Sequence, residues 1–349
     1  MSAGLVQLVA VGAQDQHLTG DPDVSYFRST YKRHTHFVQV INEHTIEGQQ
    51  SAGSLSTVRF EKSGDLLGFT YLVASNSNGE AQAIQEWKNY IDYVELLIGG
   101  QVIDRQDSEF SQELAVDILA TSFAKSASSS LAPGLGSDGE FYPLRFFFCE
   151  HWQSMIPLVA LQYHDVELRI YWGANAGTVR WNVYSSYAYL GPEERQYFLD
   201  KDHEILMFQV QKAIPSNAKV QFLNFNSPVK VLTSSNATVG ETNSLASRTN
   251  KITISVNNTE LFKPKPTAPH FTSISSYYNV PYASGNKLNQ FIYPFCMDTS
   301  KLQPSGTLNF SRVENVKIIS EEPITRNIYA INYNILKIKN GLGALLYSN

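Results

Sequence analysis

The sequence predicts an all-β protein with two domains in tandem, and three observations carry that prediction. Tyrosine and phenylalanine are frequent, with 19 of each against 4 methionines, and aromatic residues are typical of pleated, half-buried surfaces. Segments in which apolar and polar residues alternate recur between turn-forming residues, as strands require. A faint internal repeat relates the two halves of the chain.

The bulk composition limits the class of protein. The chain has 349 residues, of which 43% are hydrophobic and 17% are charged, and this is enough to form the cores of two domains. The net charge of -5 argues against a protein that mainly coats nucleic acid, because such proteins are usually basic. The apolar start, residues 1–14, lacks the basic residues of a secretion signal and is too short to span a bilayer.

The stretch from His17 to Phe37 predicts a helix followed by a cluster of basic residues. Asp21 can cap a helix that begins at Pro22, because proline is tolerated at the first helical position and a carboxylate accepts the free amides. Aromatic side chains four residues apart then share one face and can pack against a barrel. These aromatic residues are Phe27 and Tyr31, and the basic residues left in solvent are Arg28, Lys32 and Arg33.

Strands account for most of the remaining pattern. The clearest alternation lies in residues 164–172, and similar alternation occurs in residues 251–257 and 327–338. Helical pattern is scarce after the opening stretch. It is found in residues 108–123 and in residues 192–201, where a proline precedes acidic residues as at the start of a connecting helix.

The internal repeat covers both halves. Gly99-Gly100 joins two apolar strands in the first half, and Asn257-Asn258 does so in the second; both pairs tolerate the positive φ of tight hairpin turns. Cys149 and Cys296 each end an aromatic run that predicts a buried strand, and each is followed by an alternating strand. Two cysteines are too few for a disulfide framework, so we expect two reduced, buried thiols.

Three polar stretches between the strands predict exposed loops. They span residues 126–139, 234–250 and 263–276 and are rich in serine, threonine, asparagine, glycine and proline. We expect them on the outer side of the molecule, where recognition concentrates. Three sequons provide candidate acceptors for glycosylation, at Asn236, Asn257 and Asn309.

The search for chemistry predicts a protein that is not an enzyme. His34 and His36 have the spacing of a cupin-type metal pair, but the next carboxylate, Glu43, is too distant and no glycine frames the motif. The glycines of residues 134–139 lack the lysine of a phosphate-binding loop, and the sequence contains no nucleophile elbow. We therefore predict no catalytic residue, no metal and no cofactor.

Blocks of residues along the whole chain resemble one family, the double jelly-roll major capsid proteins of nucleocytoplasmic large DNA viruses, of the chlorella-virus, iridovirus and mimivirus type. The longest block is GLVQLVAVGAQDQHLTGDPDVSYFRSTYKRHTHF, residues 4–37. The other blocks follow in order, at residues 64–72, 90–104, 143–152, 156–170, 189–198, 303–318 and 329–349.

This resemblance implies an architecture and a function. The fold would be two eight-stranded antiparallel jelly-roll barrels with few short helices: an N-terminal arm at residues 1–24, a first barrel at residues 25–198 and a second at residues 199–349. The chain would form a homotrimeric, pseudo-hexagonal capsomer that tiles the icosahedral shell of a large double-stranded DNA virus. The alternatives are a lectin-like or host-attachment jelly roll and a minor capsid paralogue.

The resemblance also implies a location and partners. The protein would belong to the virion, be assembled in the host cytoplasm, and make no sequence-specific contact with nucleic acid. The arm would run toward the particle interior and contact minor capsid proteins or an internal membrane. Ion pairs within or between capsomers are an equally good role for its candidate contact residues, which are Arg28, Lys32, Arg33, His34 and His36.

Overall fold

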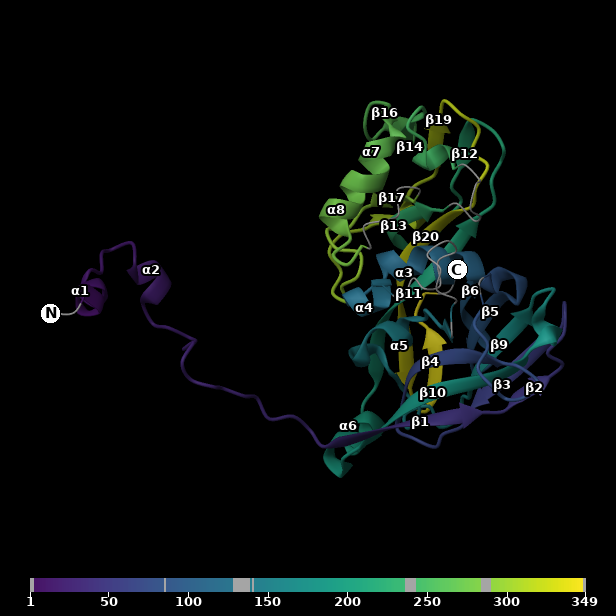
Figure 1. The fold of residues 1–349 in the computed structure, drawn as a ribbon, viewed down its shortest axis with the longest axis horizontal. Helices are drawn as coiled ribbons and strands as arrows, with labels where there is room; N and C mark the ends of the chain where they lie inside the picture. Colours follow the sequence, from purple (N-terminus) through teal and green to yellow (C-terminus); the bar gives the residue numbers. More distant parts are fainter. Residues whose placement is uncertain are drawn as a thin grey trace. The chain divides into compact units, whose positions relative to one another are not determined.

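The computed structural model describes residues 3–84, 86–127, 139, 141–235, 243–283 and 290–347. It separates into an arm, Met1–His36, and a body, Phe37–Asn349 (Figure 1). None of the helices in this described part of the chain has the length and hydropathy of a membrane span.

The arm contains two short helices, α1 (Ala3–Val9) and α2 (Gln16–Thr19). The predicted helix from Pro22 is wrong, because residues 20–36 form no helix. Asp21 has a φ of 48° and so turns the chain in the left-handed region instead of capping a helix. A short isolated helix is marginal in water without a packed face, so the common face predicted for the two aromatic side chains does not form.

Residues 37–190 of the body form two sheets. We call the sheet ordered β1-β10-β4-β7, in which β8 also pairs with β4, the β10 sheet; the other is ordered β2-β3-β9-β5-β6. The strands are β1 (Phe37–His44), β2 (Ile46–Gly48), β3 (Leu55–Phe60), β4 (Leu66–Ser75), β5 (Ile91–Ile98), β6 (Gln101–Asp107), β7 (Tyr142–Pro143), β8 (Ile156–Pro157), β9 (Val166–Trp172) and β10 (Arg180–Leu190).

Residues 203–345 form two more sheets. We call the sheet ordered β11-β20-β13-β17, which also carries β18 and β21, the β20 sheet; the other is ordered β12-β19-β14-β15 and also carries β16. The strands are β11 (His203–Ala213), β12 (Val220–Phe222), β13 (Pro228–Ser234), β14 (Lys251–Val256), β15 (Thr259–Glu260), β16 (Lys265–Pro266), β17 (Phe291–Pro294), β18 (Leu308–Asn309), β19 (Val316–Ser320), β20 (Ile328–Lys339) and β21 (Leu342–Leu345).

The strand order repeats between the two halves (Figure 1). The order β1-β10-β4-β7 of the β10 sheet corresponds to the order β11-β20-β13-β17 of the β20 sheet. In the other two sheets, the order β3-β9-β5-β6 corresponds to the order β12-β19-β14-β15. All the strand pairs are antiparallel, as the antiparallel β1–β10 and β11–β20 registers illustrate. The all-β, double jelly-roll fold class is confirmed, whereas the domain bounds stay a prediction.

Both predicted hairpin turns form. Gly99 and Gly100 have φ values of 58° and 80°, and Asn257 and Asn258 have φ values of 48° and 64°. β9 alternates as predicted, with Val166 and every second residue after it buried. In each half the hairpin is followed by a single-turn π-helix that continues as an α-helix.

The helices are short. The predicted helical segments are confirmed at η2 and α3 and at α6, which has its proline at the first turn. The helices of the body are η1 (Trp87–Asn89), η2 (Phe110–Leu114), α3 (Ala115–Ile118), α4 (Phe123–Ala127), α5 (Phe147–Glu150), η4 (Trp152–Ser154), η5 (Ala176–Thr178), α6 (Pro192–Asp200), η6 (Ser244–Ala246), α7 (Thr267–Pro269), η7 (His270–Ile274), α8 (Ser275–Asn279) and η8 (Phe310–Arg312).

Two local predictions are wrong. Cys149 lies in helix α5 and not at the end of a strand. The predicted loop at residues 263–276 instead contains β16, α7 and η7, because Phe271 packs against Phe291 and Tyr293 at centroid distances of 5.8 and 5.9 Å. Most of the other two predicted loops, residues 128–138 and 236–242, lies outside the described residues.

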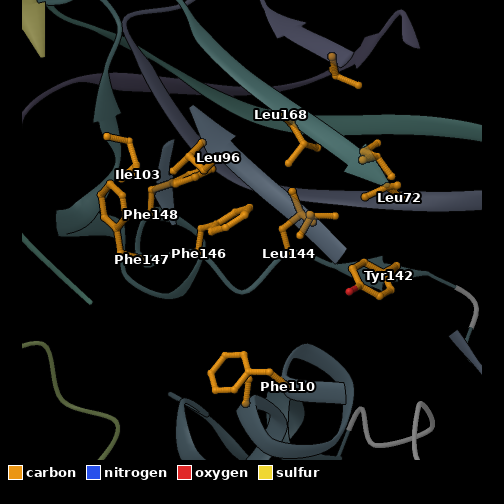
Figure 2. Close-up of a cluster of buried hydrophobic side chains, with 14 of the residues drawn as sticks. Leu72, Leu96, Ile103, Phe110, Tyr142, Leu144, Phe146, Phe147, Phe148 and Leu168 are labelled. Atoms are coloured by element: carbon orange, nitrogen blue, oxygen red, sulfur yellow. The ribbon is translucent and has the colours of Figure 1, made fainter. Parts of the chain in front are cut away.

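Two apolar clusters stabilise the body. The first fills the first barrel, where Phe146 and Phe148 lie near Leu96 and Ile103 (Figure 2). It continues into the second half of the chain through residues of the β20 sheet, including Ile331. The second cluster lies inside the second barrel. Because the first cluster includes residues of both the first barrel and the β20 sheet, a continuous apolar contact joins these two parts of the body.

Candidate interaction surfaces

The β20 sheet is buried on both faces. Along β20, Ile328 and Ala330 belong to the cluster inside the second barrel, whereas Tyr329 and Ile331 belong to the cluster of the first barrel. Successive side chains of a strand point to opposite faces. One face therefore fills the second barrel and the other is covered by the first barrel of the same chain.

Polar contacts fix this junction between the barrels. The Val210 amide donates to Asp104 Oδ1 at 2.9 Å, which connects β11 to β6. Tyr329 Oη donates to Asp107 Oδ2 and to Glu109 Oε2, both at 2.8 Å. Lys212 Nζ lies 2.6 Å from Asp107 Oδ2. Burial, reinforced by the two carboxylates, raises the pKa of Tyr329, so its hydroxyl stays a proton donor.

Two ionisable groups of the junction are almost fully buried. Burial raises the pKa of Asp104 to about 7, against the opposing effect of the Val210 and Gln106 hydrogen bonds. Burial lowers the pKa of Lys230 to about 8. Lys230 Nζ donates to the Thr299 carbonyl at 2.8 Å and lies 5.4 Å from the centroid of the Phe208 ring.

The junction is closely packed. The cavity beside Lys230 is bounded by parts of both barrels, among them Leu119, Phe147, Phe208 and Tyr333. It has a volume of about 10 Å³, which is roughly the space of one water. The two barrels therefore meet as closely as a protein core.

The corresponding face of the β10 sheet is aromatic, and within the described residues of the body it is partly exposed to solvent. Glu43 pairs with Tyr184, and Tyr184 pairs with Tyr71, so these residues mark the face that points away from the first barrel. We call it the aromatic face; its members are Ile41, Phe69, Tyr71, Phe141, Trp152 and Tyr184. The Tyr71 ring stacks on Tyr184 at a centroid distance of 5.5 Å, and the exposed fractions of Ile41 and Trp152 are 53% and 61%.

A groove of about 590 Å³ opens beside this face, lined by Phe69, Tyr71, Val73, Phe141 and Pro143 among others. Its charged side chains form ion pairs with one another. Arg145 Nη1 lies 3.3 Å from Glu150 Oε1, and Lys125 Nζ lies 3.1 Å from Glu150 Oε2. Cys149 also lines the groove, and burial raises the pKa of its thiol to about 12.

A second uncovered apolar surface lies on the second barrel. Tyr277, Tyr278 and Met297 have exposed fractions of 83%, 75% and 78%, and we call them the tyrosine–methionine patch. Asn279 Nδ2 donates to the carbonyls of Cys296 and Met297, at 3.1 and 3.3 Å. This contact connects the end of α8 to the segment that follows β17.

The predicted contact residues of the arm are all exposed: Arg28, Lys32, Arg33, His34 and His36. His34 Nδ1 lies 2.7 Å from the carbonyl of Thr35. Across the described residues, no three histidine, cysteine, aspartate or glutamate side chains are grouped as a metal ion would need. The role of the arm in binding partners stays a prediction.

Two of the three sequon asparagines are exposed, Asn257 in the turn after β14 and Asn309 at the end of β18. Asn257 Oδ1 accepts from the amides of Glu314 and Asn315, and Asn309 Oδ1 accepts from the amide of Ser311. Asn236 lies outside the described residues. Glycosylation stays a prediction at all three.

Sequence reasoning missed the junction and the aromatic face. A signal for the aromatic face exists in β4, whose run LLGFTYLVA is apolar at nearly every position. A strand with one face in solvent alternates, whereas a strand covered on both faces is continuously apolar. The continuous run in β4 is therefore typical of a strand whose outward face, like its inward face, is covered by another apolar surface.

Two protein-family models match the chain in succession. The model described as the N-terminus of the major capsid protein matches residues 25–179, and the model described as the large eukaryotic DNA virus major capsid protein matches residues 194–344. Together they cover most of the chain.

Comparisons with individual proteins and solved structures also find capsid proteins of large DNA viruses. The chain is 31% identical to a major capsid protein of Pyramimonas orientalis virus and 27% identical to one of Paramecium bursaria Chlorella virus 1, with 100% of both chains covered in each comparison. The quasi-atomic model of the PBCV-1 virus capsid superposes with a TM-score of 0.76 at 22% identity, over 93% of this chain and 100% of that one. The Faustovirus major capsid protein shares the fold, with a TM-score of 0.67 at 10% identity over 94% of each chain.

Proposed function

Because the chain belongs to the family of large eukaryotic DNA virus major capsid proteins, we propose that it acts as a homotrimer, the capsomer from which the shell is tiled. The family membership itself establishes a structural protein of the virion and not an enzyme. The number of chains per capsomer, the arrangement of capsomers and assembly in the host cytoplasm belong to the proposal.

The observation that carries the trimer is the uncovered aromatic face. The β20 sheet buries its corresponding face against a barrel, and the β10 sheet, with the same strand order, presents aromatic rings to solvent. Contiguous exposed apolar surface typically marks a protein interface. A second copy of the chain can supply the barrel that the β10 sheet lacks.

Mass photometry of the purified protein at sub-micromolar concentration tests the trimer. We expect a dominant species of about 117 kDa, three times the chain mass of 39.1 kDa. Negative-stain images of the same sample should show pseudo-hexagonal particles. A dominant single-chain species would overturn the proposal.

We further propose that the exposed cations of the arm contact acidic minor capsid proteins or an internal membrane. Arg28, Lys32 and Arg33 lie within six residues of one another. Each such charge near an anionic membrane contributes on the order of 1 kcal/mol. Together they can therefore hold the arm at such a surface without a specific pocket.

Replacing the three arm cations by glutamine tests this role. We expect trimers to form normally, while binding to vesicles of anionic lipid and retention of inner components in particles weaken. The matched control replaces three exposed cations of the second barrel, Lys219, Lys263 and Lys265. If the arm variant binds and assembles like the control, the arm cations serve only in ion pairs.

A further inference from the structure

We propose that the tyrosine–methionine patch of one copy docks on the aromatic face of the next copy, with Met297 entering the groove beside Tyr71. The inference rests on the proposed trimer and specifies its contact. It makes the interface head to tail, since the two surfaces differ, and such a contact closes into a ring when the rotation between successive copies is one third of a turn.

The junction inside the chain provides the template. On its first-barrel side it uses Leu119, directly after α3, and the segment that begins with α5, including Phe147. On its second-barrel side it uses the outward face of the β20 sheet, including Phe208 and Tyr333. The end of α3 and the segment around Cys149 thus cover the outward face of the β20 sheet.

Each of these parts has a counterpart that is exposed within the described part of the body. The residues Ala115, Val116 and Ile118 of α3 are fully buried, whereas Tyr277 and Tyr278 of the corresponding helix α8 are exposed. Glu150, directly after Cys149, is 6% exposed, whereas Met297, directly after Cys296, is 78% exposed.

The sheets differ in the same way. On the outward face of β11, Phe208 is 6% exposed, and on the outward face of the corresponding strand β1, Ile41 is 53% exposed. The two surfaces left uncovered are therefore the counterparts of the two surfaces that meet in the junction. A second copy of this chain supplies both missing partners.

The chemistry of the two surfaces matches. A methionine thioether is flexible and makes favourable contacts with aromatic rings, and the groove has aromatic walls at Phe69, Tyr71 and Phe141. Residues 271–279 carry no charged side chain. Glu150 at the groove is already paired with Arg145 and Lys125, and Asp298, directly after Met297, is paired with Lys301, so docking there leaves neither carboxylate without a partner.

The test introduces charges at the two ends of the proposed contact. We expect Met297→Glu to weaken trimerisation by at least about tenfold, because a carboxylate would enter an apolar interface. Val73→Lys, in the groove, should weaken it likewise, and the double variant should recover a measurable part of the affinity. The matched control is Ile214→Glu, since Ile214 is 76% exposed and lies away from both surfaces in sequence.

The readouts are the trimer dissociation constant by mass photometry and the circular dichroism spectrum, which shows that each variant is folded. If the wild-type protein is a trimer and both single variants trimerise like Ile214→Glu, the docking inference is wrong while the trimer stands. If the wild type is a monomer, the trimer itself is wrong. If a chain lacking residues 1–36 dissociates while Met297→Glu does not, the arm occupies the aromatic face and the inference is again wrong.

Discussion

The β10 and β20 sheets have the same strand order, but they meet different surroundings. The β20 sheet is covered on both faces, with Ile331 fully buried, while Ile41 on the β10 sheet is 53% exposed. Both sheets present large apolar side chains on the outward face. The difference therefore lies in whether a barrel of the same chain covers the outward face, and not in the composition of the sheet.

The two faces also differ in charge. The junction inside the chain includes buried ionisable groups, Asp104 and Lys230, whereas the charged side chain on the side of the aromatic face, Glu43, is exposed. A junction within one chain forms together with the fold, and its charges can be paired as the fold forms. A surface that stays in water until it meets another copy avoids the cost of desolvating charge at that step.

The largest expected contrast comes from one substitution made on each sheet. Ile331→Ala should lower the free energy of unfolding by about 2–5 kcal/mol, because it leaves a cavity in the junction. Ile41→Ala should lower it by about 0.5 kcal/mol or less in the dissociated chain, because its side chain is half exposed there. Urea unfolding at several protein concentrations measures both.

The same series also reports on trimerisation. Ile41→Ala should reduce the concentration-dependent part of the stability, since it removes apolar area from the proposed interface. Equal losses for the two variants at low protein concentration would mean that the aromatic face is already covered within one chain.

A pH-dependent contrast is expected from Asp104. Its pKa of about 7 lies above the ordinary value of 3.8, so the folded state binds the proton more tightly than the unfolded state. The resulting stabilisation is complete below about pH 3.8 and is lost as the pH rises through 7. Between these values the free energy of unfolding should fall by about 1.4 kcal/mol per pH unit relative to Asp104→Asn.

The measurement is urea unfolding of both proteins from pH 4.5 to 7. Lys230 stays protonated in this window, since its pKa is about 8, and the histidines are common to both proteins and cancel in the difference. A difference that does not change with pH would place Asp104 in contact with water.

A smaller contrast comes from the hydroxyls of two tyrosines. Tyr329→Phe should cost about 1.5–3 kcal/mol, because two carboxylates of the junction lose a donor. Tyr184→Phe on the aromatic face should change the free energy of unfolding by about 0.5 kcal/mol or less. Thermal unfolding of the two variants measures the contrast, and similar losses would show that Tyr184 Oη is also engaged in the folded chain.

The sequence predicted what depends on local patterns. The turn at Gly99 and Gly100 needs positive φ, and that requirement is visible in the residues themselves. The alternation of β9 likewise identifies its buried face. The repeat of hairpin, cysteine and strand predicted the tandem organisation, because each feature is a short local pattern and the three recur in the same order in both halves.

What depends on distant contacts could not be predicted from the pattern. The segment around Phe271 has the composition of a loop, yet it folds as short helices because that ring finds aromatic partners far along the chain. The junction joins Asp104 to Val210, which lie 106 residues apart. The helix predicted from Pro22 failed for a different reason: a local capping pattern does not by itself form so short a helix, and Asp21 takes a left-handed conformation instead.

The smallest contrast is kinetic and uses the two thiols. Cys149 lines the groove of the aromatic face, whereas Cys296 is buried under the second barrel's uncovered patch and is 4% exposed. Both thiols should react slowly in the trimer, since burial raises the pKa of Cys149 to about 12 and also raises that of Cys296.

Dissociation of the trimer should change the alkylation rates of the two thiols by different amounts. In Ile41→Asp, which introduces a charge on the aromatic face without touching either cysteine's neighbours in sequence, the groove loses its occupant and Cys149 should be alkylated faster at pH 9. Cys296 should keep its slow rate, because its cover comes from its own barrel. Mass spectrometry of iodoacetamide-treated protein resolves the two sites. Equal acceleration at both would show that the substitution loosened the second barrel, and an unchanged Cys149 would show that no neighbouring copy covers the groove.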